Sequence, residues 1–474
     1  MKKGILYCFL LITSSLSLHA QYFSTGQDPA SYRWMQLKTD SFQIIFPRHL
    51  ENMTDELATA LHLIAKAETN TLQTRVPRMP FIFHPGSVVS NGITIWAPRR
   101  IELYPCPPPD IYPEPWIEQL AIHEYRHAVQ VSKMNQGFTK ALYYLFGEQA
   151  TGAILGLYLP SWFLEGDATV TETALSSSGR GRMPSFAAPL RAQLLQKGIY
   201  SFDQATLGSY KTFIPDNYTL GYFLVASSRQ QYGWELWDQT LDRVAKYPFM
   251  VVPFNSGIRA KTGKWKNRLY RETMESLLRS WQAEEDATWK TPMYRITQLD
   301  PSNYSSYDRP QFLNDSTLVA LRISNEGVSE VVAIPFQPGN RIPETVVSQR
   351  LYRAAAYQTG SLSVAHGLVA WTEFNPDIRW QNRSYSVIKL RNPDSKFQPN
   401  SKSHVPNFRN TGSLNHSPGI QLTQDPTKHP SYIPSPLPTY PHSRFFSPAI
   451  SPSELRIATT SISEDNQSYL LVLD

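Results

Sequence analysis

The feature that most constrains this chain is residues 116–133, which follow a proline and contain neither glycine nor proline. An uninterrupted segment that starts directly after proline predicts a helix. It carries His123 and His127, with Glu124 directly after the first histidine. Residues four apart on a helix share one face, so the two imidazoles should project together, one turn apart.

Two imidazoles one helical turn apart are the arrangement that a zinc ion needs, and Glu124 beside them can act on a metal-bound water. The alternative is an exposed polar helix face whose histidines bind nothing. Catalytic zinc usually has three protein ligands and keeps one position open, so a third ligand is expected elsewhere in the chain.

The candidate for the third ligand lies in a second helix, predicted to begin at Pro160 and Ser161. It carries Glu165, at 165 − 127 = 38 positions after the second histidine. Glu165, Thr169 and Glu172 share one face of this helix. One acid can be a ligand and the other can orient a ligand, although a solvated acidic face is the alternative for Glu165 taken alone.

These two segments, "HEYRH" and "WFLEGDATVTE", together resemble the gluzincin metallopeptidases, whose pattern is His-Glu-x-x-His followed by a later glutamate in a Trp-x-x-Glu-Gly-type segment. The resemblance covers roughly residues 80–285. It implies that His123, His127 and Glu165 are zinc ligands and that Glu124 is the general base of a peptide-bond hydrolase.

The same resemblance suggests supporting residues. Glu172 matches the acid seven residues after the ligand in gluzincin aminopeptidases, where it supports a ligand. The segment "DNYTLGYFLV" resembles the Tyr-x-x-Gly segment of that family, which implies that Tyr218 stabilises the oxyanion. Tyr222, one turn later, is a rival, and a core aromatic is the alternative for both.

Two departures from the family pattern bear on substrate. The Gly-x-Met-Glu-Asn segment that recognises a free peptide N-terminus is absent, and residues 88–100 occupy that region. Thr169 stands where thermolysin-like enzymes have an orienting aspartate. Both favour an endopeptidase over an aminopeptidase, similar to exported bacterial gluzincins fused to propeller repeats. The other alternative is a non-catalytic envelope binding or scaffold protein.

The first twenty residues resemble a secretory signal peptide, with two lysines before an apolar stretch and Ala20 before a cut at Gln21. We therefore expect export to the bacterial periplasm, cell envelope or exterior, with no transmembrane span after cleavage. Cys106 is then the one remaining cysteine, which excludes an internal disulfide. Residues 139–159 predict a buried helical hairpin, with a membrane-dipping segment as the alternative.

Charge and strand patterns suggest the partners. The net charge of +6 comes without a long basic run, so nothing argues for nucleic acid. A peptide or protein substrate is expected instead. The strand near Arg99–Tyr104 could pair with an extended peptide by β-addition.

The character of the chain changes near residue 291. Residues 21–290 mix helix and strand patterns and are expected to form the metallopeptidase domain. Residues 291–474 contain three similar stretches of strands and turns, which predict partial propeller-like repeats. The third stretch resembles the WD40-like repeats of periplasmic propellers.

The propeller prediction is incomplete. Closure takes four to eight blades, and about three are recognisable, so the alternatives are a truncated propeller or an open sheet. A segment rich in proline, serine and asparagine at about residues 393–443 predicts a disordered insertion. The expected fold is thus α+β: a thermolysin-like gluzincin domain, then an all-β propeller-like region that could bind a protein partner.

Overall fold

A computed structural model of the chain gives its fold. It describes residues 28–75, 77–108, 115–209, 211–293, 295–297, 303–325, 329–335, 349–353, 359–377, 383–393, 444–453, 456–463 and 465–473. The expected signal peptide and nearly all of the expected insertion at 393–443 lie outside these residues. Among the described helices, none is both long and apolar enough to cross a membrane.

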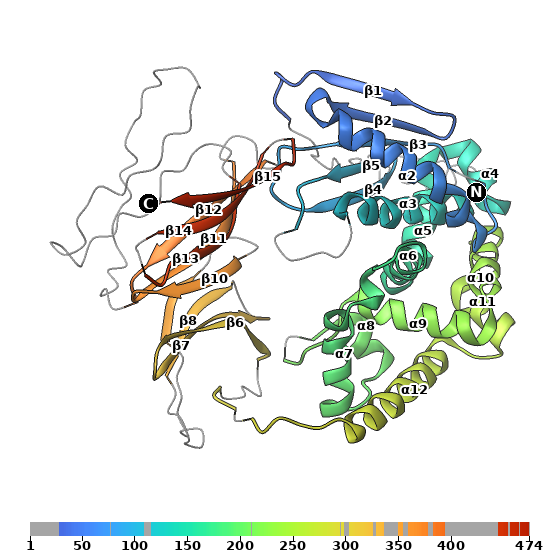
Figure 1. Cartoon of the computed structure of the whole chain (residues 1–474). Helices are drawn as coiled ribbons and strands as arrows, with labels where there is room; N and C mark the ends of the chain where they lie inside the picture. Colours follow the sequence, from blue (N-terminus) through green and yellow to red (C-terminus); the bar gives the residue numbers. More distant parts are fainter. Residues whose placement is uncertain are drawn as a thin grey trace, which may run out of the picture.

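The described chain is a mixed α+β structure, as predicted, with a helix-rich part and a strand-rich part (Figure 1). The helix-rich part begins with a five-stranded sheet in the order β1-β2-β3-β5-β4. Its strands are β1 Trp34–Lys38, β2 Phe42–Pro47, β3 Met79–Phe83, β4 Asn91–Trp96 and β5 Arg99–Tyr104.

The order of these strands corrects one expectation. β5 pairs in parallel with β3 on one side and antiparallel with β4 on the other, so it is an internal strand. Its backbone groups are already paired, and Arg99–Tyr104 cannot add a peptide substrate as predicted. β4 is one of the two edge strands of this sheet, β1 being the other, and it is the edge strand next to β5.

Helices pack against the sheet and one another around a single apolar core. α2 forms because Leu57, Leu61 and Ala65 recur at a spacing of four and are all buried.

The described residues of this part form two 3₁₀ helices and eleven α-helices. They are η1 Arg48–Leu50, α2 Glu51–Asn70, α3 Trp116–Met134, α4 Gly137–Phe146, α5 Glu148–Tyr158, α6 Ser161–Leu175, η2 Arg180–Arg182, α7 Pro184–Lys197, α8 Phe202–Leu207, α9 Asn217–Tyr232, α10 Glu235–Lys246, α11 Pro253–Thr262 and α12 Lys266–Ala287.

A pair of glycines sets the crossing of α6 and α9. A Cβ atom added at Gly166 would overlap the main chain of Gly221, and one added at Gly221 would overlap the carbonyl oxygen of Trp162. The two helices therefore approach to backbone contact, which no larger residue at these positions permits. This crossing brings the first turns of α6 and α9 together.

The segment 139–159 forms a helical hairpin, α4 and α5, as predicted, but the prediction that it is buried is wrong. Tyr144, Leu145 and Leu157 are each at least 70% exposed. The reason is that neighbouring elements cover one side of the hairpin, through Thr139 and Leu155, and leave the other open.

The strand-rich part consists of three antiparallel sheets. Each is a meander in which consecutive strands pair, and the second and third correspond to two of the similar stretches in the sequence. The strands are β6 Ser305–Asn314, β7 Thr317–Ser324, β8 Glu330–Pro335, β9 Gln349–Arg353, β10 Thr359–Ala365, β11 Leu368–Pro376, β12 Ser384–Arg391, β13 Phe445–Ile450, β14 Ile457–Ile462 and β15 Ser468–Leu473.

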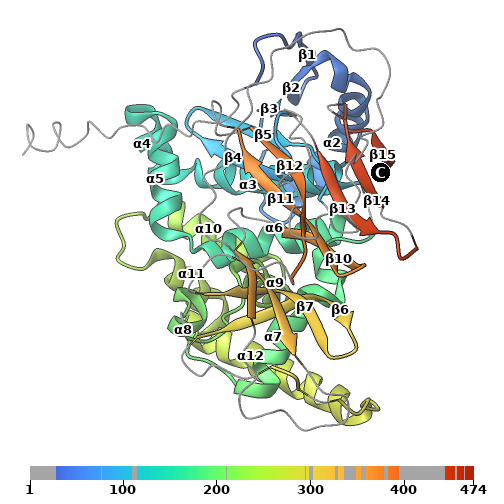
Figure 2. The ribbon, with the colours of Figure 1, turned by 90° about the vertical axis from the view of Figure 1, so that its left-hand side faces the viewer.

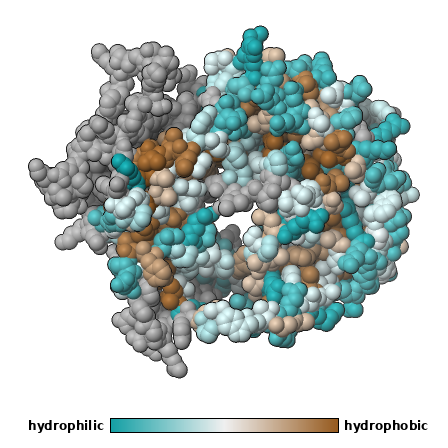
Figure 3. Space-filling view, in the orientation of Figure 1, coloured by the Kyte–Doolittle hydropathy of each residue, from teal (hydrophilic) through white to brown (hydrophobic). Residues whose placement is uncertain are grey.

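β15 is an edge strand with apolar side chains on its surface. Leu470 and Val472 are 77% and 63% exposed. Figure 3 shows a brown area on the strand-rich side of the molecule.

The loop between β3 and β4 joins the two parts. The Ser384 hydroxyl lies 3.0 Å from that of Ser87 and accepts the main-chain N–H of Val88. The Arg444 guanidinium donates to the carbonyl of Pro85. The buried thiol of Cys106 lies in an apolar cluster shared by the two parts, with Val88, Val89, Phe374, Phe446 and Ile462.

Candidate metal centre

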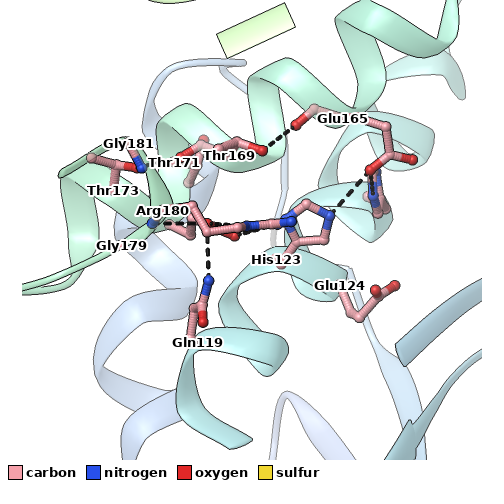
Figure 4. A network of polar contacts seen from close by, with 12 residues as sticks. Gln119, His123, Glu124, Glu165, Thr169, Thr171, Thr173, Gly179, Arg180 and Gly181 are labelled. Carbon is pink, nitrogen blue, oxygen red and sulfur yellow. Dashed lines mark hydrogen bonds and ion pairs between the residues drawn. The ribbon is translucent and has the colours of Figure 1, made fainter. Parts of the chain in front are cut away.

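Two helices bring the three expected ligands together. His123 and His127 lie one turn apart on α3, and Glu165 is the fifth residue of α6. One oxygen of Glu165, Oε2, is 3.2 Å from Nε2 of His123 and 3.5 Å from Nε2 of His127. Among the described residues, this is the one group of three acidic, histidine or cysteine side chains whose donor atoms all lie within 4.8 Å of one another. Figure 4 shows Glu165 directed toward His123 from the neighbouring helix.

The other nitrogen of His123 is held by Glu172, which is fully buried. Glu172 Oε2 lies 2.9 Å from Nδ1 of His123, and its Oε1 accepts a hydrogen bond of 3.0 Å from Gln119. Arg180 donates to both oxygens of Glu172, at 2.6 and 2.8 Å. Burial by itself would raise the pKa of Glu172, but the Arg180 guanidinium lowers it to about 2. Arg180 Nη2 also lies 2.8 Å from Nδ1, so this nitrogen is enclosed by Glu172 and Arg180, and Nε2 is the nitrogen that faces Glu165.

Gln130 orients the ring of His127 as Glu172 orients that of His123. Gln130 donates through Nε2 to Asp167 at 2.9 Å and to the carbonyl of Leu164 at 3.0 Å. Its oxygen must then face Nδ1 of His127, which lies 2.9 Å away. Since an amide oxygen only accepts, Nδ1 carries the proton, and Nε2 again points at Glu165.

The pKa values fit a site that exchanges protons for a cation. Burial would raise the pKa of Glu165, but hydrogen bonds with His123 and His127 bring it below its ordinary range. Burial would lower the pKa of His127, but the hydrogen bond with Glu165 raises it to about 9. His127 and Glu165 are thus an ion pair at neutral pH, at the point where the three donor atoms meet. Two imidazole nitrogens and one carboxylate are the donor set of a catalytic zinc site.

A buried ion-pair network underlies the ligands. Arg126 donates to Asp167 through Nε at 2.7 Å and through Nη2 at 3.1 Å, and Arg229 donates to the same carboxylate. Burial would raise the pKa of Asp167, but the two guanidinium groups lower it to about 2. These contacts tie α3, α6 and α9 together directly behind the two histidines.

Glu124 lies between α3 and the edge strand β4. The Thr94 hydroxyl is 2.7 Å from Oε2 of Glu124 and 2.8 Å from its main-chain oxygen. A Cβ added at Gly92 would lie 2.6 Å from Cγ of Glu124, so glycine lets the strand pass close to this carboxylate. The expected general base therefore faces β4, one of the two edge strands of the sheet.

The structure separates the two candidate tyrosines. The Tyr218 ring lies 5.8 Å from the ring of His123, with the Arg180 guanidinium 4.7 Å above its centre. Burial and the nearby charge of Glu165 raise its pKa, so the phenol stays protonated and can donate. Tyr222 instead packs against Phe186, at 5.7 Å, and against Gly181. Tyr218 is the tyrosine next to His123.

Sequence reasoning missed Gln130, Arg180 and Asp167. Gln130 is three residues after His127, and Asp167 is two residues after Glu165, so both stood within or beside the quoted motifs. Arg180 lies beyond the end of α6, in η2, and no spacing rule connects it to the site. Thr169, which stands where an aspartate was looked for, donates to the carbonyl of Glu165 at 2.8 Å.

Comparison with models of known protein families gave no match, and comparison with curated protein sequences gave no similar protein either.

Proposed function

We propose that this chain is a zinc-dependent metallopeptidase that cleaves peptide bonds within a polypeptide, as the gluzincins do. The observation that carries the proposal is the shared direction of three donors. Nε2 of His123 and Nε2 of His127 face the same oxygen of Glu165, while Glu172 and Gln130 occupy the opposite nitrogens. Zinc held by this set would acidify a bound water to a pKa of about 7 and polarise a carbonyl.

The chain's own residues account for the proton transfers. Glu124 takes a proton from the attacking water as its oxygen bonds to the carbonyl carbon, and then passes the proton to the leaving amine as the C–N bond breaks. The Tyr218 hydroxyl donates a hydrogen bond to the oxygen that becomes negative. Arg180 holds Glu172 and thereby the orientation of His123.

The substrate would lie along β4. Of the two edge strands of the sheet, this is the one whose Thr94 contacts Glu124. A peptide that pairs with an edge strand is held by main-chain hydrogen bonds, so it is extended and of loosely restricted sequence. An extended internal segment suits an endopeptidase.

The remaining assignments belong to the same proposal. The protein is exported to the bacterial periplasm, envelope or exterior, and its strand-rich part is propeller-like and binds a substrate protein or partner. The three consecutive meanders, each of three or four strands, support the propeller-like assignment.

The test is a measurement of bound zinc and of casein cleavage. We expect one zinc per chain in the wild type and in Glu124→Gln, with cleavage reduced about 10²- to 10⁴-fold in the variant because the general base is lost. Glu165→Ala should lose zinc. Glu118→Gln is the matched control, because it changes a glutamate of the same helix.

Three results would contradict the proposal. Wild-type protein that binds no zinc would refute the site. Unchanged cleavage in Glu124→Gln would refute the role of this residue. Stoichiometric zinc without cleavage of any peptide would favour a non-catalytic binding protein.

A further inference from the structure

Two segments far apart in the sequence expose apolar side chains on one side of the helix-rich part. They are the α4–α5 hairpin and the loop between α10 and α11. Figure 2 shows both at the left edge, with the hairpin projecting above the loop. The ring of Phe138 lies 5.8 Å from that of Phe249, edge to face, and the Tyr158 hydroxyl donates to the carbonyl of Pro248. The exposed apolar residues are Phe138, Tyr144, Leu145, Phe146, Leu157, Tyr247, Phe249, Val251 and Val252.

The shape of this surface restricts what it can contact. Leu145 and Phe146 are 73% and 62% exposed beside Gly147, where the hairpin turns, and Val251 in the loop is 92% exposed. These side chains stand on projecting tips. Apolar side chains on a projecting hairpin tip can enter a deformable medium such as the outer part of a lipid bilayer.

The charges around the surface favour an anionic medium. Glu148 pairs with Arg99 at 3.2 Å, and Asp242 pairs with Lys246 at 2.8 Å. Lys140, exposed on α4, lies 6.0 Å from the centre of the Tyr144 ring and has no carboxylate within ion-pair distance in the described part of the chain. The carboxylates of Glu148 and Asp242 are thus paired with cations, whereas Lys140 is not paired with a carboxylate. The charge of Lys140 complements the negative headgroups of phospholipids.

We propose that the α4–α5 hairpin and residues 247–252 bind the surface of a membrane that contains anionic phospholipid. Leu145, Phe146 and Val251 enter the acyl-chain boundary, and Tyr144 lies at headgroup level, where aromatic side chains with a polar end are stable. Lys140 contacts the phosphate. This binding does not involve the metal centre and does not depend on the proposed peptidase activity.

The experiment is co-sedimentation of the purified protein with vesicles. One set of vesicles is phosphatidylethanolamine with phosphatidylglycerol, and the other is phosphatidylcholine alone. We expect the wild type to bind the anionic vesicles more strongly. Leu145→Glu with Phe146→Glu should lower the partition coefficient at least about tenfold, because two large apolar groups no longer leave water. Lys140→Glu should weaken binding to the anionic vesicles selectively.

The matched control is Leu207→Glu, which changes an 85% exposed leucine on α8 and should bind vesicles like the wild type. Circular dichroism and thermal melting check that all variants fold. Equal binding by the double variant and the wild type, or no binding by the wild type, would overturn the proposal. So would self-association without lipid that the double variant abolishes, since the surface would then be occupied by a second copy of the chain.

Discussion

Replacing Glu68 with glutamine should change how the stability of this protein depends on pH. Glu68 is completely buried on α2, and neither of its carboxylate oxygens has a hydrogen-bond partner among the described residues. Burial raises the pKa of this carboxyl from 4.5 to about 8, although the Arg126 guanidinium acts in the opposite direction. The folded protein therefore keeps a proton on Glu68 at pH values where the unfolded chain has lost it.

The sign and size of the effect follow from this difference. Between pH 4.5 and about 8 the folded state binds more protons than the unfolded state, so the free energy of unfolding falls as pH rises. The fall amounts to at most about 1.4 kcal/mol per pH unit, or roughly 3 kcal/mol from pH 5.5 to 7.5. Glutamine has nearly the same shape and cannot ionise, so this part of the pH dependence should disappear.

Urea unfolding followed by tryptophan fluorescence, at several pH values in this range, measures the effect. The informative quantity is the slope of the free energy of unfolding against pH. The absolute difference in stability between the Glu68→Gln variant and the wild type is set by packing. The advantage of the variant should grow with pH. The control Glu56→Gln, at an exposed position of the same helix, should show no such growth. A constant difference between Glu68→Gln and wild type would refute the reasoning.

Three further substitutions test the packing behind the site. Gly221→Ala should destabilise the protein by about 3 kcal/mol or more, seen as a lower melting temperature, because α6 and α9 must separate. Asp167→Asn should lower the free energy of unfolding by about 3–5 kcal/mol in urea, because it leaves the buried Arg126 and Arg229 without their counter-charge. Asp216→Ala should lower it by about 1 kcal/mol, because α9 loses the side chain that caps its first turn.

Each of these has a control. Gly156→Ala changes a helical glycine with no atom within 4 Å of the added Cβ and should leave stability unchanged or raise it. Asp55→Asn changes an exposed aspartate and should be neutral. Asp216→Asn keeps a capping oxygen and should behave like the wild type. Equal melting temperatures for Gly221→Ala and Gly156→Ala would show that the helix crossing tolerates a methyl group.

Much of the local structure could be predicted because its signals are local. The helix over 116–133 and the helix opened by Pro160 both appear as expected. The order of strands could not be predicted, because the parallel pairing of β5 with β3 depends on the chain between them. Exposure of the α4–α5 hairpin was missed because composition does not reveal how many neighbours an apolar helix has.

In the candidate site, too, residues with a local sequence signal could be predicted and the others could not. His123, His127 and Glu165 were found because ligand spacing on a helix is fixed and the partner motif is compact. Arg180 was missed because a bend after α6 returns it to Glu172, and that bend leaves no periodic signal. Gln130 was missed because glutamine is common on helix surfaces, and only its hydrogen bonds reveal its task.

The loop between β3 and β4 has a mechanical consequence. The strand-rich part forms hydrogen bonds with this loop at Pro85, Ser87 and Val88. A few residues later the chain forms β4, whose Thr94 contacts Glu124. A displacement of the strand-rich part would therefore act through residues 85–94 on the strand beside Glu124, the expected general base. A force on the strand-rich part would thus also act on β4, the strand beside the candidate metal centre.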